Sequence, residues 1–322
     1  MQHARETIDM EYYIFANDRT GRLFADILRR KARQGVRVRL IVDGYGSLSI
    51  GRGMHRELLN GGVELARHSL MSRSRNHRKM TIIDGRVAHV GGVNIADRYV
   101  VGNALGVWHD AQLRITGDAV AAISRLFDYD HMVSDGVVCE VPMAYTSAHE
   151  QVVWSECSGG RAMLELLSSV IASARRRLVM ATPYLMPPQS VVNQLAEAVE
   201  RGVDVTIIIP ERCDVWVLDH IIRQHIVQAL ARGINIRICR HNFVHAKFAI
   251  VDDQYAVVGS ANLDARSISL NREIMVLTRN RKVVEASRGF VDRLLWMSYA
   301  PDKRDKRSYI PAFVCRWFED VL

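Results

Sequence analysis

The sequence predicts an α/β protein made of two duplicated halves, each a mainly parallel or mixed β-sheet flanked by helices. The first observation is a repeated order of strand, helix and strand, which implies right-handed crossovers between neighbouring strands. The second is a pair of β-branched runs, Val36–Val42 and Val203–Ile209, typical of strands buried on both faces. The third is a nearly constant offset between matching positions of the two halves. His77 and His245 lie 168 residues apart, and the two runs lie 167 apart.

The first half opens with a predicted strand over residues 8–15 and an amphipathic helix over 22–34. Gly35 follows at the C′ position, where glycine often ends a helix, and the buried run over 36–42 comes next. These elements form the first strand–helix–strand unit, which the second half repeats.

The second half has the matching strand over 178–182, the helix over 189–200 and Gly202 before its buried run. The chain then adds a predicted helix near 215–232 and strands near 234–239, 247–251, 256–259 and 274–278. The repeat therefore extends over most of each half.

The composition is that of a folded, basic protein. Hydrophobic residues make up 48% and charged residues 24% of the 322 residues, which excludes a disordered chain and allows a sizeable core. The net charge of +8 favours an anionic partner such as phospholipid headgroups, nucleic acid or a phosphorylated small molecule. The cysteines form no C-x-x-C pair and their number is odd, which favours reduced thiols over a disulfide framework or a zinc site. They are Cys139, Cys157, Cys213, Cys239 and Cys315.

The start of the chain departs from the repeat. The second half has a predicted helix over 161–174 before its first strand, whereas the first strand of the first half begins seven residues after Met1. We therefore expect truncation upstream, with about ten residues of an equivalent helix missing. The sequence has no run of 18 apolar residues and no signal-peptide pattern, so we expect no transmembrane segment within it.

Each half carries the pattern H-x-K-x4-D, followed by a turn of small residues and an Asn. A single H-x-K on a strand is usually a packed or surface histidine, but two copies with equal spacing favour catalysis. The other histidines lack a second signal and we interpret them as structural, whereas His109 and His225 stay open with a structural role favoured. The candidate catalytic residues are His77, Lys79, Asp84, His245, Lys247 and Asp252.

Strand character explains the spacing of this motif. Lys79–Ile83 and Lys247–Val251 are apolar segments, and residues i and i+2 of a strand point to one face. Each histidine and its lysine should therefore project together into one pocket. The following small-residue turn lets the backbone approach closely and places an Asn amide alongside. The candidate phosphate-binding residues are Asn94, Asn262 and Ser260.

These side chains fit a displacement reaction at a phosphodiester. Fixed positive charge and hydrogen-bond donors stabilise the charge that develops on the phosphoryl oxygens. One histidine can attack as neutral imidazole and form a phosphohistidine, while the other protonates the leaving oxygen and later deprotonates the incoming hydroxyl. Because the two motifs are nearly symmetric, the residues alone do not assign which histidine attacks.

Each histidine also needs a partner that fixes its tautomer. Asp84 and Asp252 lie seven residues beyond their histidines, near the end of the strand, so we expect them to brace the following turn. We expect Asp110 and Glu273 to orient the histidines. The sequence contains no metal cage of Asp, His and Cys and no P-loop pattern, so it predicts chemistry without a metal or cofactor.

The duplicated motif resembles that of the phospholipase D superfamily over nearly the whole chain, and finer features are similar to bacterial cardiolipin synthases. The resemblance implies two similar α/β halves with the active site at their pseudo-two-fold interface, His77 as nucleophile and His245 as acid and base. It also implies transfer of a phosphatidyl group between two phosphatidylglycerol molecules at the bacterial inner membrane, with anchoring segments upstream. The finer features lie in Asn76–Lys79, Gly91–Tyr99, Trp108–Gly117, Thr182–Tyr184 and Gly259–Ser267.

The repeat divides the chain into a first half over 1–140, a linker over 141–160, a second half over 161–300 and a tail over 301–322. The tail combines basic and aromatic side chains, which suits a membrane interface, while packing against the body of the protein explains it equally well. The expected partners are an anionic phospholipid, namely phosphatidylglycerol, and a membrane surface.

Three other functions stay open. A nuclease of the same superfamily needs the same histidines, but the sequence has no basic-aromatic ladder for a nucleic-acid strand, so nucleic acid is not an expected partner. A phospholipase D or phosphatidylserine synthase differs only in the acceptor. A non-catalytic binding module is disfavoured by two complete motifs. The sequence leaves the acceptor alcohol, the acyl-chain preference and the oligomeric state open.

Overall fold

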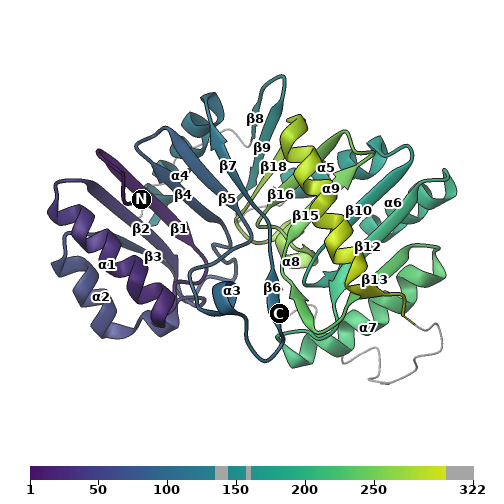
Figure 1. The fold of residues 1–322 in the computed structure, drawn as a ribbon, viewed down its shortest axis with the longest axis horizontal. Helices are drawn as coiled ribbons and strands as arrows, with labels where there is room; N and C mark the ends of the chain where they lie inside the picture. The colour runs from purple at the N-terminus through teal and green to yellow at the C-terminus, as the bar shows by residue number, and fades with distance from the viewer. Residues whose placement is uncertain (135–143, 157–160, 302–322) are drawn as a thin grey trace.

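The computed structural model describes residues 1–134, 144–156 and 161–301. Figure 1 shows two α/β halves side by side, the N-terminal one in purple and blue and the C-terminal one in green and yellow. Each half has a central sheet with helices packed against it, and the two sheets meet along the middle of the molecule. The predicted α/β class and duplication are confirmed.

Within the described residues, the first sheet has six strands in the order β3-β2-β1-β4-β5-β7. These strands are β1 (Thr7–Tyr12), β2 (Arg37–Asp43), β3 (Glu64–His68), β4 (Lys79–Ile83), β5 (Val87–Gly91) and β7 (Gln112–Thr116). The other elements of this half are α1 (Arg19–Arg33), a 3₁₀ turn (Leu48–Ile50), α2 (Gly51–Asn60), α3 (Arg98–Val101), β6 (Val107–His109) and α4 (Asp118–Ser134).

The second sheet repeats this order in its inner strands, β13-β12-β10-β15-β16-β18. These strands are β10 (Arg177–Ala181), β12 (Asp204–Pro210), β13 (Asn235–Cys239), β15 (Lys247–Val251), β16 (Tyr255–Gly259) and β18 (Glu273–Thr278). The helices of this half are α5 (Arg161–Ser173), α6 (Gln189–Glu200), α7 (Trp216–Ala231), α8 (Ala265–Ser269) and α9 (Arg281–Trp296). Short strands complete it: β11 (Leu185–Met186), β14 (Asn242–Val244), β17 (Leu263–Asp264) and β19 (Ser298–Tyr299).

Both sheets are mixed. The three strands before each motif pair in parallel, as in β1–β2 and β10–β12. The motif strands β4 and β15 pair antiparallel with β1 and β10, and the strands that follow them are antiparallel as well. Each motif strand therefore lies at the centre of its sheet, with its histidine just before the strand begins.

Part of the range predicted as a linker, 141–160, forms strands of the second sheet. β8 (Ala144–Thr146) and β9 (Glu150–Ser155) form a hairpin, and β9 pairs with β18 as part of the second sheet. Trp154 explains the difference, because it is buried in a core shared between the halves, together with Ile82 and Ile274. Residues 135–143 and 157–160, and the predicted tail from 302 on, lie outside the described residues.

Local sequence fixes where the first helices begin and end. Asp18 accepts a hydrogen bond from the Gly21 amide at the start of α1, with an oxygen–nitrogen distance of 2.9 Å. Gly35 and Gly202 follow α1 and α6 with φ angles of 86° and 87°, in the left-handed region that glycine adopts without strain. Among the described helices, none is long and apolar enough to span a bilayer.

Candidate active site

The motif histidines meet where the two halves join, and each is held by the backbone of the opposite half. The amide of His77 donates to the carbonyl oxygen of Arg272 over 3.0 Å. The amide of His245 donates to the carbonyl oxygen of His109 over 2.8 Å, next to the parallel pairing of β6 with β14. In both cases the accepting residue directly precedes an acidic residue, so one backbone contact brings a carboxylate to each imidazole.

The side chains complete these crossed pairs. Nδ1 of His77 lies 2.9 and 3.0 Å from the two carboxylate oxygens of Glu273. Nδ1 of His245 lies 2.6 Å from Oδ2 of Asp110. A carboxylate at Nδ1 holds the Nδ1–H tautomer and leaves Nε2 as the reactive nitrogen. Both histidines line one cavity of about 390 Å³ between the halves.

Two buried ammonium groups stand beside the imidazoles. Lys79 and Lys247 are 0% and 1% exposed, and each donates from Nζ to the carbonyl oxygen of its own histidine. Nζ of Lys247 also lies 3.0 Å from the ring nitrogens of His245. Burial lowers the pKa of Lys79 well below its ordinary value and that of Lys247 to about 8. Each ammonium has further protons to donate to a phosphoryl oxygen. The negative charge of that oxygen would raise the pKa of the lysine and favour its charged form.

The two histidines differ in their electrostatic surroundings. Burial lowers the pKa of His77, but the charge of Glu273 opposes this effect. Burial acts to raise the pKa of Glu273, yet His77 and Lys79 hold it below its ordinary value, so this carboxylate is ionised. For His245, burial and then Lys247 lower the pKa well below the ordinary value, while burial raises that of Asp110 to about 7. At 2.6 Å, Asp110 and His245 share one proton near neutral pH.

Close approach at the interface requires glycine at two positions. A Cβ atom on Gly92 would lie 2.2 Å from Oδ1 of Asp110 and would displace the carboxylate that holds His245. A Cβ on Gly259 would lie 2.1 Å from the carbonyl oxygen of Ile274, next to Glu273. The glycines of the small-residue turns therefore let both carboxylates reach their histidines.

A family model described as "Cardiolipin synthase, PLD-like domain" matches residues 1–129 and 167–295, which correspond to the two halves of the fold. The chain belongs to this family. The match thus covers two phospholipase D-like units, each with one motif histidine.

Bacterial cardiolipin synthases are among the curated proteins similar to this phospholipase D-like chain. It is 32% identical over 295 residues to the major cardiolipin synthase of Bacillus subtilis (strain 168), covering 84% of this chain and 60% of that protein. It is 33% identical over 295 residues to a cardiolipin synthase of Geobacillus kaustophilus (strain HTA426), covering 85% of this chain and 58% of that protein. The chain spans about 60% of the length of these relatives.

Solved structures share the fold at low identity. A phosphatidylserine synthase from Haemophilus influenzae Rd KW20 matches with a TM-score of 0.78 at 13% identity, covering 99% of this chain and 88% of that one. A polyphosphate kinase from Porphyromonas gingivalis matches with a TM-score of 0.67 at 16% identity, covering 99% of this chain and 49% of that one. These likenesses establish the phospholipase D-like fold.

The motif aspartates stand apart from the histidines, which corrects their place in the candidate catalytic set. The carboxylate of Asp84 accepts hydrogen bonds from the backbone amides of residues 5–7 at 2.7 to 3.1 Å. Asp252 accepts from those of residues 175–177 at 2.8 Å. Both have positive φ, 53° and 52°, in the turn after the motif strand. They join this turn to the start of β1 or β10, as their position beyond the strand indicated.

The candidate phosphate-binding residues divide into two groups. Ser260 is fully buried and its hydroxyl donates a hydrogen bond to Glu273 over 2.5 Å, so we infer that it positions Glu273 rather than contacts a phosphate. Asn94 and Asn262 line the cavity. Asn94 accepts from the Ile14 amide and donates one amide proton to the Tyr99 hydroxyl, which leaves its second proton for a ligand.

The cavity also contains residues that were not predicted from the sequence. Tyr13 packs edge-on against the His77 ring with a centroid distance of 4.9 Å, and Tyr99 against the His245 ring at 5.1 Å. Arg98 and Arg266 also line the cavity. These arginines could have been found, because each lies four residues after its motif Asn and they keep the offset of 168. The described residues contain no cluster of three His, Cys, Asp or Glu that could hold a metal ion.

Proposed function

We propose that this chain carries the catalytic centre of a cardiolipin synthase, which transfers a phosphatidyl group from one phosphatidylglycerol to another and releases glycerol. The observation that carries the proposal is the crossed arrangement of His77 with Glu273 and His245 with Asp110 around one cavity. Paired histidines, each held at Nδ1 by a carboxylate and accompanied by a buried lysine, fit a double displacement at a phosphodiester. The names of the curated relatives support the choice of substrate.

The first step forms a covalent intermediate. Nε2 of His77 attacks the phosphorus of the donor phosphatidylglycerol, a nitrogen–phosphorus bond forms and the bond to the glycerol oxygen breaks. The leaving oxygen takes its proton from Nε2 of His245, so glycerol departs neutral. Ionised Glu273 stabilises the positive charge that the His77 ring acquires. The products are a phosphatidyl-histidine and glycerol.

The second step reverses the proton transfer with a new alcohol. Nε2 of His245 removes the proton from a glycerol hydroxyl of the second phosphatidylglycerol, and the hydroxyl oxygen bonds to phosphorus as the bond to His77 breaks. Lys79 and Lys247 stabilise the phosphoryl oxygens in both steps. Cardiolipin leaves, and His77 returns to its neutral form with Nδ1 held by Glu273.

Binding of the phosphodiester prepares His245 as the acid. Burial, Lys247 and Lys79 lower the pKa of His245, whose Nδ1 faces Asp110. The negative charge of a bound phosphodiester compensates the positive charge of the lysines. The pKa of His245 therefore rises, and the protonated imidazole becomes more favourable. With substrate bound, the imidazole of His245 therefore carries a proton on each nitrogen, with Nδ1–H directed at Asp110 and Nε2–H directed at the leaving oxygen.

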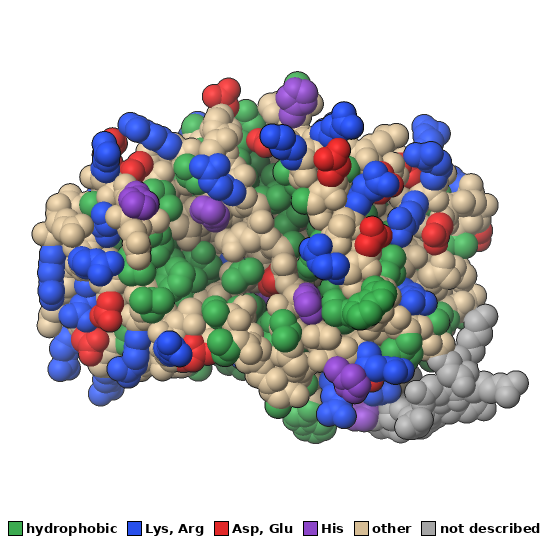
Figure 2. Space-filling view, viewed as in Figure 1, with side chains coloured by type: hydrophobic (Ala, Val, Ile, Leu, Met, Phe, Trp, Pro, Cys, Tyr) green, Lys and Arg blue, Asp and Glu red, His purple; other side chains and the backbone are tan. Residues whose placement is uncertain are grey.

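The side chains at the rim of the cavity suit contact with the surface of the bacterial inner membrane. Tyr45 and Val215 line the cavity and are 55% and 37% exposed, and the adjacent Trp216 is 75% exposed. Apolar and aromatic side chains at the mouth would enter the interfacial region of a bilayer and bring the headgroup to the histidines. Figure 2 shows Lys and Arg side chains over both halves, in accord with attraction to anionic lipid.

The test is incubation of the purified protein with phosphatidylglycerol vesicles in EDTA, with mass spectrometry of the lipid products. We expect cardiolipin and free glycerol, with both products lost in His77→Ala and His245→Ala. Phosphatidic acid as the sole product would make the protein a hydrolase. Absence of any lipid product together with cleavage of DNA would replace the lipid substrate by nucleic acid. Loss of all activity in EDTA that Mg²⁺ restores would contradict metal-independent chemistry.

A further inference from the structure

Arg98, the first residue of α3, lies beside the proposed acid–base histidine. Its guanidinium carbon lies 5.4 Å from the ring centroid of Tyr99 and 5.3 Å from that of Trp108. The imidazole of His245 packs against the same two rings, at centroid distances of 5.1 and 5.2 Å. Arg98 and His245 therefore share one aromatic wall, and both line the cavity between the halves.

The charge of Arg98 is not compensated by the protein. In the parts of the chain that the structure describes, its Nε is buried without a hydrogen-bond partner and the guanidinium forms no ion pair with a carboxylate. A buried donor without an acceptor costs free energy, and arginine donors arranged as a planar fork fit the oxygens of a phosphate. The free donor and the uncompensated charge indicate a place for an anion.

The corresponding residue of the second half differs in this respect. Arg266 lies 168 residues after Arg98 and donates from Nη2 to the carbonyl oxygen of Arg73 over 2.7 Å. The carboxylate of Asp264 acts on Arg266 and favours its charged form, whereas Ala96 occupies the position equivalent to Asp264 in the first half. Of this duplicated pair of arginines, Arg98 is therefore the one without a neighbouring carboxylate among the described residues.

We propose that Arg98 binds the phosphate of the acceptor phospholipid, forming a second anion subsite next to the one where phosphoryl transfer occurs. This inference rests on the proposed function. In the second step the acceptor hydroxyl must approach phosphorus opposite the His77 bond, which is the side of His245. The acceptor's own phosphate follows its hydroxyl by one glycerol unit, so it comes to rest near the aromatic wall that carries Arg98.

A subsite of this kind decides the fate of the covalent intermediate. Water and simple alcohols have no phosphate for Arg98 to bind, whereas phosphatidylglycerol does. Arg98 therefore favours transfer to an anionic phospholipid over hydrolysis or transfer to a neutral alcohol. Its effect falls on the choice of acceptor rather than on formation of the phosphohistidine.

The experiment measures how one intermediate divides between two acceptors. Phosphatidylglycerol vesicles are incubated with the enzyme in dilute ethanol, and the ratio of cardiolipin to phosphatidylethanol is measured by mass spectrometry. Because both products arise from the same phosphohistidine, the ratio is independent of donor binding and of the amount of folded enzyme. Loss of a charge-assisted contact in Arg98→Gln should lower the ratio roughly 10- to 100-fold. Arg98→Lys, which keeps the charge without the fork, should lie between wild type and Arg98→Gln.

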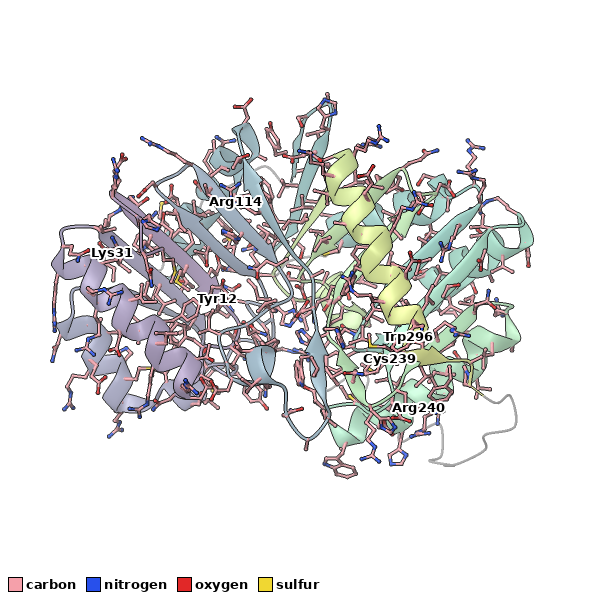
Figure 3. All side chains as sticks on the ribbon, in the orientation of Figure 1. Tyr12, Lys31, Arg114, Cys239, Arg240 and Trp296 are labelled. Atoms are coloured by element: carbon pink, nitrogen blue, oxygen red, sulfur yellow. The ribbon has the colours of Figure 1, made fainter. Side chains whose placement is uncertain are left out.

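The matched control is Arg240→Gln. Arg240 also stacks on a tyrosine, Tyr299, with its guanidinium carbon 4.7 Å from the ring centroid, and Figure 3 shows it in the C-terminal half at the lower edge of the view. This variant should keep the wild-type ratio. A wild-type ratio in Arg98→Gln would overturn the acceptor subsite while leaving cardiolipin synthesis intact, and equal losses in Arg98→Lys and Arg98→Gln would exclude the charge as the cause. A wild-type enzyme that makes phosphatidylethanol without cardiolipin would overturn the proposed function and the subsite with it.

Discussion

The two histidine sites share a motif but differ in what surrounds it. Beside His77 the middle residue of the motif is Arg78, which is fully buried, pairs with Asp130 and Glu156 and donates to the carbonyl oxygen of Glu273. Removing one member of such a buried network is strongly destabilising, because it leaves the other charges unpaired. The His77 site is therefore set in a rigid, charged support that spans both halves.

Beside His245 the middle residue is Ala246, and aromatic rings take the place of charges. Trp108 packs on Phe243 and on His245, with centroid distances of 4.3 and 5.2 Å. In these surroundings burial raises the pKa of Asp110 to about 7, whereas Glu273 in the other site is ionised. An ionised carboxylate suits a nucleophile that becomes cationic, and a proton-sharing pair suits an acid. The divergence of the two settings supports attack by His77 and proton transfer by His245.

The largest expected effect is the loss of activity when either histidine is removed, and a second substrate distinguishes the nucleophile from the acid. With phosphatidylglycerol, His77→Ala and His245→Ala should each lose at least about 10⁴-fold in activity, as expected when one member of a cooperating set is removed. A phosphatidyl ester of p-nitrophenol needs no acid for its leaving group. With this substrate His245→Ala should accumulate phosphohistidine, detected by intact-protein mass spectrometry, and His77→Ala should not. A phosphoenzyme in His77→Ala but not in His245→Ala would reverse the assignment.

Neutralising the two carboxylates that orient the histidines should lower kcat by unequal factors. Glu273→Gln removes a negative charge next to the attacking ring and should lower kcat about 10³-fold. Asp110→Asn replaces a group that is already half protonated near neutral pH, so the loss should be smaller, about 10- to 100-fold at pH 6 to 7. Steady-state kinetics on both variants, with thermal unfolding to verify folding, make the comparison. Equal losses would show that the two carboxylates act alike.

The duplication could be predicted from the sequence because the repeat preserves the spacing of its motifs. A constant offset of 168 placed the motif residues, and the spacing predicted that each lysine lies beside its histidine, whose carbonyl oxygen accepts a hydrogen bond from Nζ. Parallel and antiparallel strands buried on both faces leave the same apolar pattern, so the antiparallel pairing of β4 with β1 could not be read from it. The hairpin of β8 and β9 was missed because it has no counterpart in the first half.

Contacts in the site between residues far apart in the sequence could be assigned only from the structure. Glu273 reaches His77 across 196 residues and Asp110 reaches His245 across 135, and no local spacing reports which acid serves which histidine. The contact of Ser260 with Glu273 was not predicted for the same reason, because a serine after the motif strand can face either a phosphate or this carboxylate. The motif aspartates were placed more accurately, since their distance from the histidine follows from strand geometry.

The lysine of the His245 site should give a pH dependence of binding. The pKa of Lys247 is lowered to about 8, so the ammonium is charged below this pH and neutral above it. KM for phosphatidylglycerol should therefore rise above pH 8, by about 3- to 10-fold, while Lys247→Arg, which stays charged, should flatten the rise. Steady-state kinetics from pH 6 to 10 on both enzymes test this. A rise of equal size in Lys247→Arg would place the titrating group elsewhere.

The smallest effects should come from the motif aspartates and should be equal in the two halves. Asp84→Ala and Asp252→Ala each remove a carboxylate that accepts backbone hydrogen bonds, so each should lower the free energy of unfolding by about 1–2 kcal/mol and leave kcat within about twofold. Backbone hydrogen bonds hold the pKa of both carboxyls below the ordinary value, against the effect of burial. Their stabilisation is therefore present above the unfolded pKa and is lost as the pH falls through the lowered one. Urea unfolding at neutral and acidic pH measures both, and a large fall in kcat for either variant would return that aspartate to the catalytic set.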